Sequence, residues 1–160
     1  MTLSTGYTIR PATPSDAAIL AEFRAAMFTD MGAALENGAV PFWTTYFVVA
    51  LTDGRYRALL AERAGEVAAC AGLMVFPTVP TPGDPSGQRA HIQGVYTLPT
   101  HRGRGLAVEL TRALLRVAQA QDIGSVNLNA SVMGQGVYQR LGFVAAKAPE
   151  LRLNLREARL

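Results

Sequence analysis

The sequence contains very little cysteine. Cys70 is the only one, so the chain can form no internal disulfide, and this favours a reducing compartment, which we expect to be the cytoplasm. Because Cys70 lies in an apolar, strand-like run, we predict a buried and inert thiol. The first six residues lack the charged and apolar regions of a signal peptide, and none is predicted.

Long apolar runs are also missing. The longest, residues 39–51, is interrupted by Pro41, Thr44 and Thr45 and falls short of the roughly 20 residues that span a bilayer, so no membrane partner is predicted. Charged residues make up only 17% of the chain and apolar residues 49%, a balance that excludes a disordered protein. With 160 residues, the chain is predicted to be a single domain, residues 1–160, with a core of its own.

Lysine is nearly absent, since Lys147 is the only one, and the net charge of +3 comes from arginine. A mildly basic surface suits an anionic ligand. The arginines are scattered and do not alternate with aromatic residues, so no nucleic-acid partner is predicted. The two histidines, His91 and His101, lack carboxylates at ligand spacing, and no metal site is predicted.

Apolar periodicity and turn residues predict the order of helices and strands. Strands are expected at residues 7–10, 57–62, 66–76, 90–97, 125–130, 143–146 and 151–155, and helices at residues 15–28, 106–121 and 136–141. Residues 42–51 fit a buried helix or a strand, and a helix is favoured because the span is long and does not alternate. This order predicts an α/β layer fold with a mixed sheet, in which residues 90–130 form one βαβ crossover.

A glycine-rich turn between a strand and a helix is the most informative segment. The strand stops at Pro99, Gly103 and Gly105 follow among arginines, and a helical pattern begins at once. In such a turn, backbone N–H groups and the positive end of the helix dipole stabilise an anion. The turn fits neither a P-loop nor a dinucleotide fingerprint, since both spacings are absent. It predicts a phosphate site, although a turn of this kind can also simply reverse the chain.

Two motifs resemble those of the GCN5-related N-acetyltransferase (GNAT) family. Residues 102–107, Arg-Gly-Arg-Gly-Leu-Ala, match the family's acyl-CoA-binding pattern Gln/Arg-x-x-Gly-x-Gly/Ala at every fixed position, and residues 95–99 look like the family's fourth strand with its terminating proline. Residues 138–143, Tyr-Gln-Arg-Leu-Gly-Phe, are similar to the family's Tyr-x-x-x-Gly-Phe element. The resemblance implies a mixed, mostly antiparallel sheet of 6–7 strands, about four flanking helices and a splayed pair of parallel strands.

The resemblance also implies acetyl-CoA as the acyl donor and direct transfer of its acetyl group to a primary amine. The pyrophosphate of coenzyme A would lie against the turn, and its pantetheine arm would pair with the preceding strand. The implied cofactor contacts are Val95, Tyr96, Thr97, Arg102, Gly103, Arg104, Gly105, Leu106, Ala107 and Tyr138. Asn129, Ser131 and Gly134 fill the stretch where many members carry a cofactor-contacting Asn. The two arginines fit equally well as solvated loop residues.

Tyr138 is the general acid that the resemblance implies. A phenol with a pKa of about 10 can donate a proton to a leaving thiolate of similar basicity. A tyrosine that merely packs in a helix ending at Gly142 is the alternative. A backbone N–H near Tyr96 or Thr97 would stabilise the carbonyl oxygen during transfer.

The general base is less well indicated. His91 is the first candidate because an imidazole accepts a proton near neutral pH, although it also fits as a solvated residue at the end of a loop. Glu62, Glu22 and Asp30 are weaker candidates.

The acceptor is expected over the first helices and the loop of residues 77–89. That loop holds four prolines and two glycines and predicts either a substrate lid or a plain surface insertion. Aromatic side chains with one carboxylate suit a small cationic amine, although core packing explains the aromatics equally well. The candidate acceptor residues are Phe28, Asp30, Trp43 and Tyr46.

Other functions stay open at this point. The sequence does not separate a small-molecule amine from a peptide N-terminus. A non-catalytic acyl-CoA-binding sensor is the main alternative, and the intact Tyr138 argues against it. A protein that binds a different nucleotide phosphate at the same turn is a third. An exposed strand edge or the two closing strands could also pair to give a homodimer.

Overall fold

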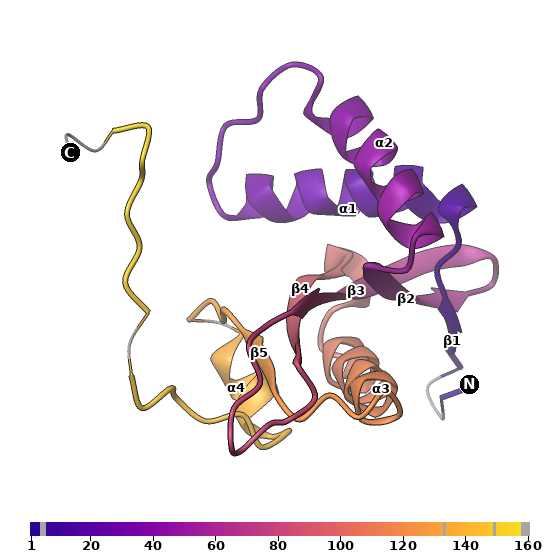
Figure 1. Cartoon of the computed structure of the whole chain (residues 1–160). Coiled ribbons are helices and arrows are strands. Elements are labelled where there is room, and N and C mark those ends of the chain that lie inside the picture. Colours follow the sequence, from indigo (N-terminus) through magenta and orange to yellow (C-terminus); the bar gives the residue numbers. More distant parts are fainter. Residues whose placement is uncertain (4–5, 133, 149, 158–160) are drawn as a thin grey trace.

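A five-stranded sheet runs through the computed structural model, which describes residues 1–3, 6–132, 134–148 and 150–157 (Figure 1). Its strands follow the chain in the order β1 (Thr8–Pro11), β2 (Tyr56–Arg63), β3 (Glu66–Pro77), β4 (Gln88–Thr97) and β5 (Val126–Leu128). The first four strands pair antiparallel, and β5 pairs parallel to β4. The mixed sheet, the hairpin of β2 and β3 and the parallel pair were all predicted, and all three are confirmed.

The helices lie in two layers, one on each face of the sheet (Figure 1). They are α1 (Ala17–Asp30), α2 (Ala39–Thr52), α3 (Leu106–Gln119) and the short α4 (Gln135–Gln139), with single 3-10 turns at Pro14–Asp16 and Pro99–His101. The helix favoured for residues 42–51 is confirmed as α2. It buries only one side, because Phe47 and Ala50 face the core whereas Val48 and Val49 are exposed. No helix in the described part of the chain is long and apolar enough to cross a membrane.

The two faces of strand β4 pack against different helix layers. Ala90 and Ile92 pack in the core beneath α3, whereas Tyr96 packs on the opposite face, where its ring lies 5.5 Å from that of Phe23 in α1. Side chains alternate along a strand, so His91, between Ala90 and Ile92, belongs to the face of α1 and α2.

A bulge bends β4 at Gly94. The register with β3 passes from Cys70↔Tyr96 to Gly72↔Gln93, so β4 carries an extra residue there, and Gly94 adopts a left-handed φ of 63°. The Cys70 thiol donates a hydrogen bond to the Gly94 carbonyl, at 3.2 Å. Burial raises the pKa of Cys70 to about 12, so the thiol is buried and inert as predicted. A bulge bends and twists its strand, which turns the end of β4 away from β5.

The closing strands expected at residues 143–146 and 151–155 are absent, so the described part of the sheet has five strands rather than 6–7. β5 is also shorter than predicted. Residues 151–155 do alternate apolar and polar side chains, but they run clear of the body without a partner strand (Figure 1). Alternation shows that a segment could lie on a sheet, yet a strand forms only where a neighbouring backbone accepts its hydrogen bonds.

Candidate active site

Strands β4 and β5 part toward the C-terminal end of β4, and the space between the parting strands is called the cleft below. The last register pair between them joins Ile92 to Leu128, whereas β4 continues from Gln93 to Thr97. Tyr96 and Thr97 pair with β3 on their other side. In the described structure, the other edge of this stretch faces no partner strand, although the Thr97 carbonyl there accepts a hydrogen bond from Arg102. Val95, Tyr96 and Thr97, which were predicted as cofactor contacts, line that free edge.

The turn after β4 forms an open cradle of backbone N–H groups. Gly103 and Gly105 take left-handed φ angles of 75° and 76°, and Gly105 is the N-cap of α3. The first N–H that bonds within the helix is that of Glu109, which donates to the Gly105 carbonyl at 3.1 Å. The N–H groups of the preceding turn, including Leu106 and Ala107, have no intrahelical acceptor. A Cβ at either glycine would meet no atom within 4 Å, so the space beside both glycines is open.

The His101 side chain connects this turn to Tyr7 and Glu66, two residues that are distant in the sequence. Its Nδ1 lies 2.7 Å from the hydroxyl of Tyr7, which is fully buried beside β1. Its Nε2 lies 3.6 Å from a carboxylate oxygen of Glu66, the first residue of β3. The cradle is therefore held by residues that are distant in sequence, and these contacts could not be predicted from local patterns.

Arg102 turns away from the cradle. Its Nε donates to the Thr97 carbonyl at 3.0 Å, and its terminal nitrogen donates to the carboxylate of Asp30, the last residue of α1. The bond with Asp30 raises the pKa of Arg102. Asp30, predicted as an acceptor contact or a base, is therefore occupied by an arginine of the cofactor turn. This ion pair connects the end of α1 to the glycine-rich turn after β4.

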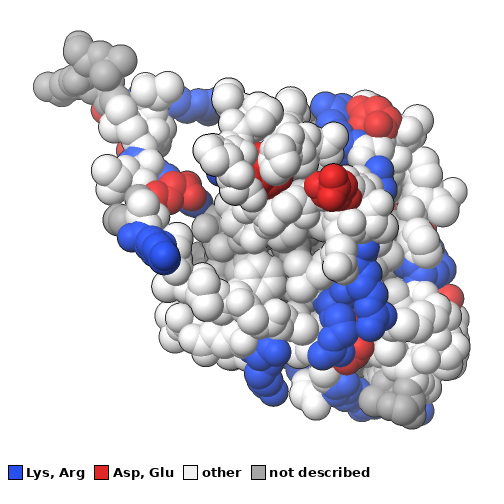
Figure 2. Space-filling model, turned by 60° about the horizontal axis from the view of Figure 1, so that its bottom comes forward, with Lys and Arg blue, Asp and Glu red and all other residues white. Residues whose placement is uncertain are grey.

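Arg104 lies on the opposite side of the turn. It donates to the Thr100 carbonyl at 3.4 Å and lines a hollow of about 370 Å³ with Gly105 and two arginines of α3, Arg112 and Arg116. Glu109 pairs with Arg112. Figure 2 shows basic side chains gathered on this side of α3, with an acidic group among them. Positive charge therefore lies directly beside the cradle.

His91 bridges the closed end of the cleft. Its Nδ1 lies 3.0 Å from Oδ1 of Asn127, its register partner on β5. This contact joins the two strands through their side chains, and Nε2 of the ring takes no part in it. The sequence singled out His91 but not Asn127, because pairing between strands 36 residues apart cannot be read from spacing.

Tyr138 lies on α4, close behind the end of β5. The side chain is half-buried, and burial raises the pKa of its phenol above the usual 10.0. Its ring packs edge-on against Phe143 at 6.0 Å, and a Cβ at Gly134 would lie 3.5 Å from it. Ser131 accepts a hydrogen bond from the Gly134 N–H at 3.1 Å. Ser131 and Gly134 thus shape the turn that carries Tyr138.

Two weaker base candidates lie elsewhere. Glu62 pairs with Arg10 at the β1 side of the sheet, and Glu22 is exposed on α1. The structure brings neither to the cleft. Asn129 directly follows β5 and is exposed, so it remains at the mouth of the cleft.

A pocket of about 610 Å³ opens beside the end of α1. It lies between α1, α2 and the segment that joins them, and Phe28, Leu35, Glu36, Phe42 and Trp43 are among its lining residues. Phe28 and Trp43 stack at 5.7 Å with an interplanar angle of 23°, and the Arg24 guanidinium lies over both rings. Two of the four predicted acceptor residues thus meet here. The segment of residues 33–38 was missed, because it carries no recognisable motif.

Tyr46 does not line this pocket. Its ring packs against Phe47 and the Arg55 guanidinium. The loop of residues 78–87 joins β3 to β4, so it enters β4 at the opposite end from the glycine-rich turn. Its Asp84 accepts a hydrogen bond from the Ser86 hydroxyl at 2.6 Å, and this bond is the main reason why the pKa of the carboxyl group is lowered. The expected role of this loop beside the acceptor therefore stays a prediction.

Comparison with known proteins settles the family. A family model described as "Acetyltransferase (GNAT) family" matches residues 21–143, most of the chain. The chain belongs to this family. This GNAT protein is therefore an acyltransferase that depends on acetyl-CoA, as the resemblance of its two motifs implied. A comparison with curated protein sequences gave no match.

Solved GNAT structures share the whole fold. A predicted acetyltransferase from Clostridium acetobutylicum, solved with acetyl-CoA, is 28% identical with a TM-score of 0.87, and the likeness covers 95% of this chain and 98% of that one. A GCN5-related N-acetyltransferase from Ralstonia eutropha is 29% identical with a TM-score of 0.82, covering 92% and 99%. Glucosamine-6-phosphate N-acetyltransferase from Arabidopsis thaliana, at 18% identity, a TM-score of 0.72 and coverage of 93% and 98%, shares the fold.

Proposed function

We propose that the protein transfers the acetyl group of acetyl-CoA directly to a primary amine while both are bound. This proposal rests on one observation: the glycine-rich cradle and the unpaired edge of β4 lie next to each other. The cradle at the start of α3 is continuous with the free edge of β4, so one extended ligand with a diphosphate can occupy both. The contacts proposed for coenzyme A are those predicted from the sequence, with the backbone from Arg102 to Ala107 at the diphosphate and residues 95–97 along the pantetheine arm.

We assign Tyr138 the role of general acid toward the departing thiolate. Burial favours the neutral phenol, so its raised pKa keeps the proton in place at neutral pH until a strong base forms nearby. A free backbone N–H near Tyr96 or Thr97 is proposed to hold the carbonyl oxygen as it gains negative charge.

We assign His91 the role of proton acceptor. Its Nδ1 contacts Asn127, so Nε2 is the nitrogen left to accept the proton, and alternation along β4 places the ring on the face of α1 and α2. The amine must lose a proton on that face, because the pocket beside Phe28 and Trp43 opens there. An imidazole can take that proton directly or through a water molecule.

The acceptor pocket favours an amine with an apolar group. Asp30 is paired with Arg102 and does not line the pocket, so the carboxylate that can meet the charge of an amine there is that of Glu36. The stacked rings of Phe28 and Trp43 add an aromatic wall. We propose that an aromatic or bulky aliphatic part of the acceptor packs against this wall, with its amine directed toward β4.

The first test compares the thermal stability of the protein with acetyl-CoA, CoA, ATP and NAD. A ligand at 100 times its dissociation constant stabilises the folded state by about 2.7 kcal/mol, which gives a clear rise in melting temperature. We expect this rise with acetyl-CoA and CoA and not with ATP or NAD. A larger shift with ATP or NAD would contradict the proposed donor site.

The second test measures thiol release from acetyl-CoA with paired amines of similar basicity. Phenethylamine and tryptamine represent apolar acceptors, and putrescine and ethanolamine represent polar ones. Preference for the first pair, reduced in Trp43→Ala, is the expected result. Binding of acetyl-CoA without turnover by any amine in a broad panel would favour the sensor over the enzyme.

A further inference from the structure

A buried tyrosine lies on the face of the sheet that α1 and α2 cover. Tyr56 is the first residue of β2, only 4% of it is exposed, and its ring packs 5.1 Å from that of Phe47 in α2. Tyr56 and His91 both pair with Met74 of β3, one from each side, so their side chains belong to the same face. The phenol and the proposed proton acceptor therefore lie in one row across the sheet.

Two glycines show where the phenol ends. A Cβ at Gly72 of β3 would lie 1.8 Å from the Tyr56 hydroxyl oxygen and 2.2 Å from the ring carbon that carries it, so the phenol occupies the space that a side chain at position 72 would need. A Cβ at Gly94, in the bulge of β4, would lie 3.3 Å from the same oxygen. The hydroxyl therefore extends across β3 and ends beside the bulge.

Within the described part of the chain, the Tyr56 hydroxyl makes no hydrogen bond. A hydroxyl on a side chain this deeply buried normally has a partner, because leaving it without one costs free energy. Burial raises the pKa of Tyr56 well above its usual value, so the phenol stays neutral and can both donate and accept a hydrogen bond. A neutral hydroxyl in this situation points to a partner that arrives with the substrate.

The bulge is also where the proposed path of acetyl-CoA ends. A ligand with its diphosphate at the cradle runs back along β4 from Thr97, and the unpaired edge stops at Gln93, because Ile92 is paired with β5. The acyl end is therefore expected beside Gly94. The amine is proposed to reach it from the face of α1 and α2, which is the face that carries the Tyr56 hydroxyl.

We propose that the Tyr56 hydroxyl accepts a hydrogen bond from the acceptor amine and directs its lone pair toward the acyl carbon. This role rests on the proposed function, because it takes the course of acetyl-CoA along β4 from there. Tyr56 gives up no proton itself, and proton transfer stays with His91 and Tyr138. A glycine inside a strand weakens it, so Gly72 is expected where the space that it clears is used.

Tyr56→Phe tests this role, because it keeps the ring and removes only the oxygen. No hydrogen bond within the described structure is lost, so the melting temperature should hold or rise. The value of kcat/KM for the best amine of the panel should fall about 10-fold, mainly through KM, with unchanged affinity for acetyl-CoA. A lower melting temperature with unchanged kcat/KM would show that Tyr56 only packs, and would overturn the role.

Thr111→Val is the matched control. Thr111 on α3 also buries a hydroxyl oxygen that has no partner among the described residues, but it lies on the opposite face of the sheet. Removing this oxygen should also keep or raise the melting temperature, and kcat/KM for the amine should stay as in wild type. A loss of activity as large as that in Tyr56→Phe would mean that the effect does not depend on the acceptor face, and would overturn the role.

A binding measurement separates this role from the proposed function. Calorimetry follows the same amine as it binds to the complex of the protein with CoA, which requires no turnover. Wild type is expected to bind the amine, and Tyr56→Phe to bind it about 10-fold more weakly. Turnover in wild type, with equal amine affinity in both proteins, would overturn the role of Tyr56 alone. A wild type that neither binds nor acetylates any amine would overturn the proposed function and this role with it.

Discussion

At the scale of single residues, Tyr138 gives the clearest division between binding and chemistry. Tyr138→Phe keeps the ring and its packing against Phe143 but removes the proton donor. We expect acetyl-CoA to bind as before and turnover to fall by about 10²- to 10⁴-fold, the usual contribution of a general acid. Calorimetry and thiol release measure the two effects separately. Equal rates in variant and wild type would remove Tyr138 from the mechanism.

The same residue predicts a pH dependence. The acid works in its protonated form, and burial raises its pKa above 10.0. Wild-type turnover should therefore show no decline caused by Tyr138 below about pH 10. A basic limb that falls near neutral pH and persists in Tyr138→Phe would belong to another group.

Gly105 tests the cradle itself. Its φ of 76° strains any L-residue, and its missing side chain leaves the space in front of the helix N-terminus open. Gly105→Glu adds a negative charge where the diphosphate is proposed to lie and should abolish acetyl-CoA binding in a folded protein. Gly105→Ala introduces the same backbone strain without the charge, so it should weaken binding less. Calorimetry with unchanged affinity for the Glu variant would contradict the proposed position of the diphosphate.

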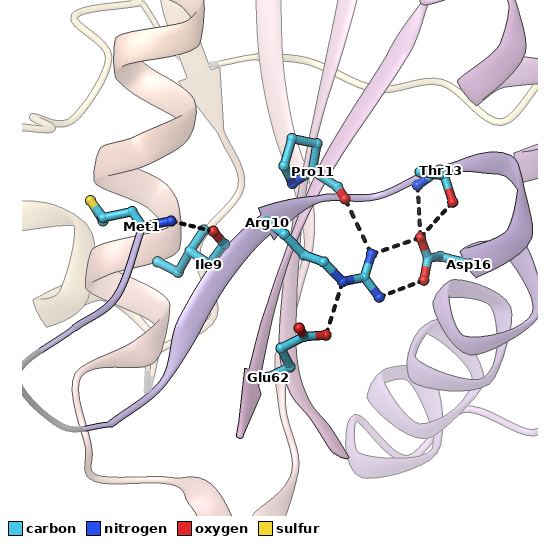
Figure 3. A network of polar contacts seen from close by, with 7 residues as sticks. All are labelled: Met1, Ile9, Arg10, Pro11, Thr13, Asp16 and Glu62. Atoms are coloured by element: carbon cyan, nitrogen blue, oxygen red, sulfur yellow. Dashed lines mark hydrogen bonds and ion pairs between the residues drawn. The ribbon is translucent and has the colours of Figure 1, made fainter. Parts of the chain in front are cut away.

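At the scale of elements, one ionic network joins β1 to the start of α1 (Figure 3). Arg10 donates two hydrogen bonds to the Asp16 carboxylate, at 2.8 and 2.9 Å, and one to Glu62 at 2.9 Å. The N–H and hydroxyl of Thr13 also donate to Asp16, at 2.7 and 2.9 Å. The pKa of Asp16 is held far below its usual value of 3.8, first by its bonds with Arg10. The carboxylate is therefore favoured strongly in the folded state.

Asp16→Asn should reduce the free energy of unfolding by about 2 kcal/mol at pH 7, because charged hydrogen bonds are replaced by weaker ones. A depressed pKa stabilises the folded state above the unfolded value near 3.8, and the benefit is lost as the pH falls through the lower folded value. The difference between variant and wild type should thus shrink below pH 4 in urea titrations. Asp53→Asn, which breaks an exposed pair with Arg55, is the control and should cost at most about 1 kcal/mol.

Some of these elements could be predicted from the sequence and others could not. The turn at Gly65, the amphipathic α3 and the glycine cradle were predicted because each depends on residues close together in the chain. The strand pattern of residues 151–155 was recognised correctly as a pattern, yet it predicted the wrong structure within one chain. Whether such a segment pairs depends on an edge elsewhere, which local periodicity does not contain.

The site divides in the same way. Gly103, Gly105 and Tyr138 belong to short motifs, so their roles could be predicted from the sequence. The partners that hold the site in place come from distant segments: Tyr7 holds His101, and Asn127 holds His91. Asp30 was noted for its charge alone, because its pairing with Arg102 spans 72 residues. Contacts of this range follow from the packing of layers, so only the folded structure shows them.

At the scale of the whole molecule, the sheet separates the layer of α1 and α2, the proposed acceptor side, from the α3 layer, which begins at the glycine-rich turn (Figure 1). The pair of Arg102 and Asp30 joins the end of α1 to that turn across the edge of the sheet. Both side chains are nearly half-exposed, so the pair contributes little to global stability. Its loss should instead change how binding of acetyl-CoA affects binding of the amine at the proposed acceptor pocket.

Asp30→Asn should accordingly change the melting temperature very little and raise the KM for the amine more than it lowers kcat. The reason is that α1, which carries Phe28 into the acceptor pocket, loses its tie to the cofactor turn. Acetyl-CoA affinity should hold or improve, because the released Arg102 can turn toward the cradle. Glu22→Gln, an exposed change on the same helix, is the matched control. An unchanged KM in Asp30→Asn, with the best amine of the panel, would show that the two layers act independently.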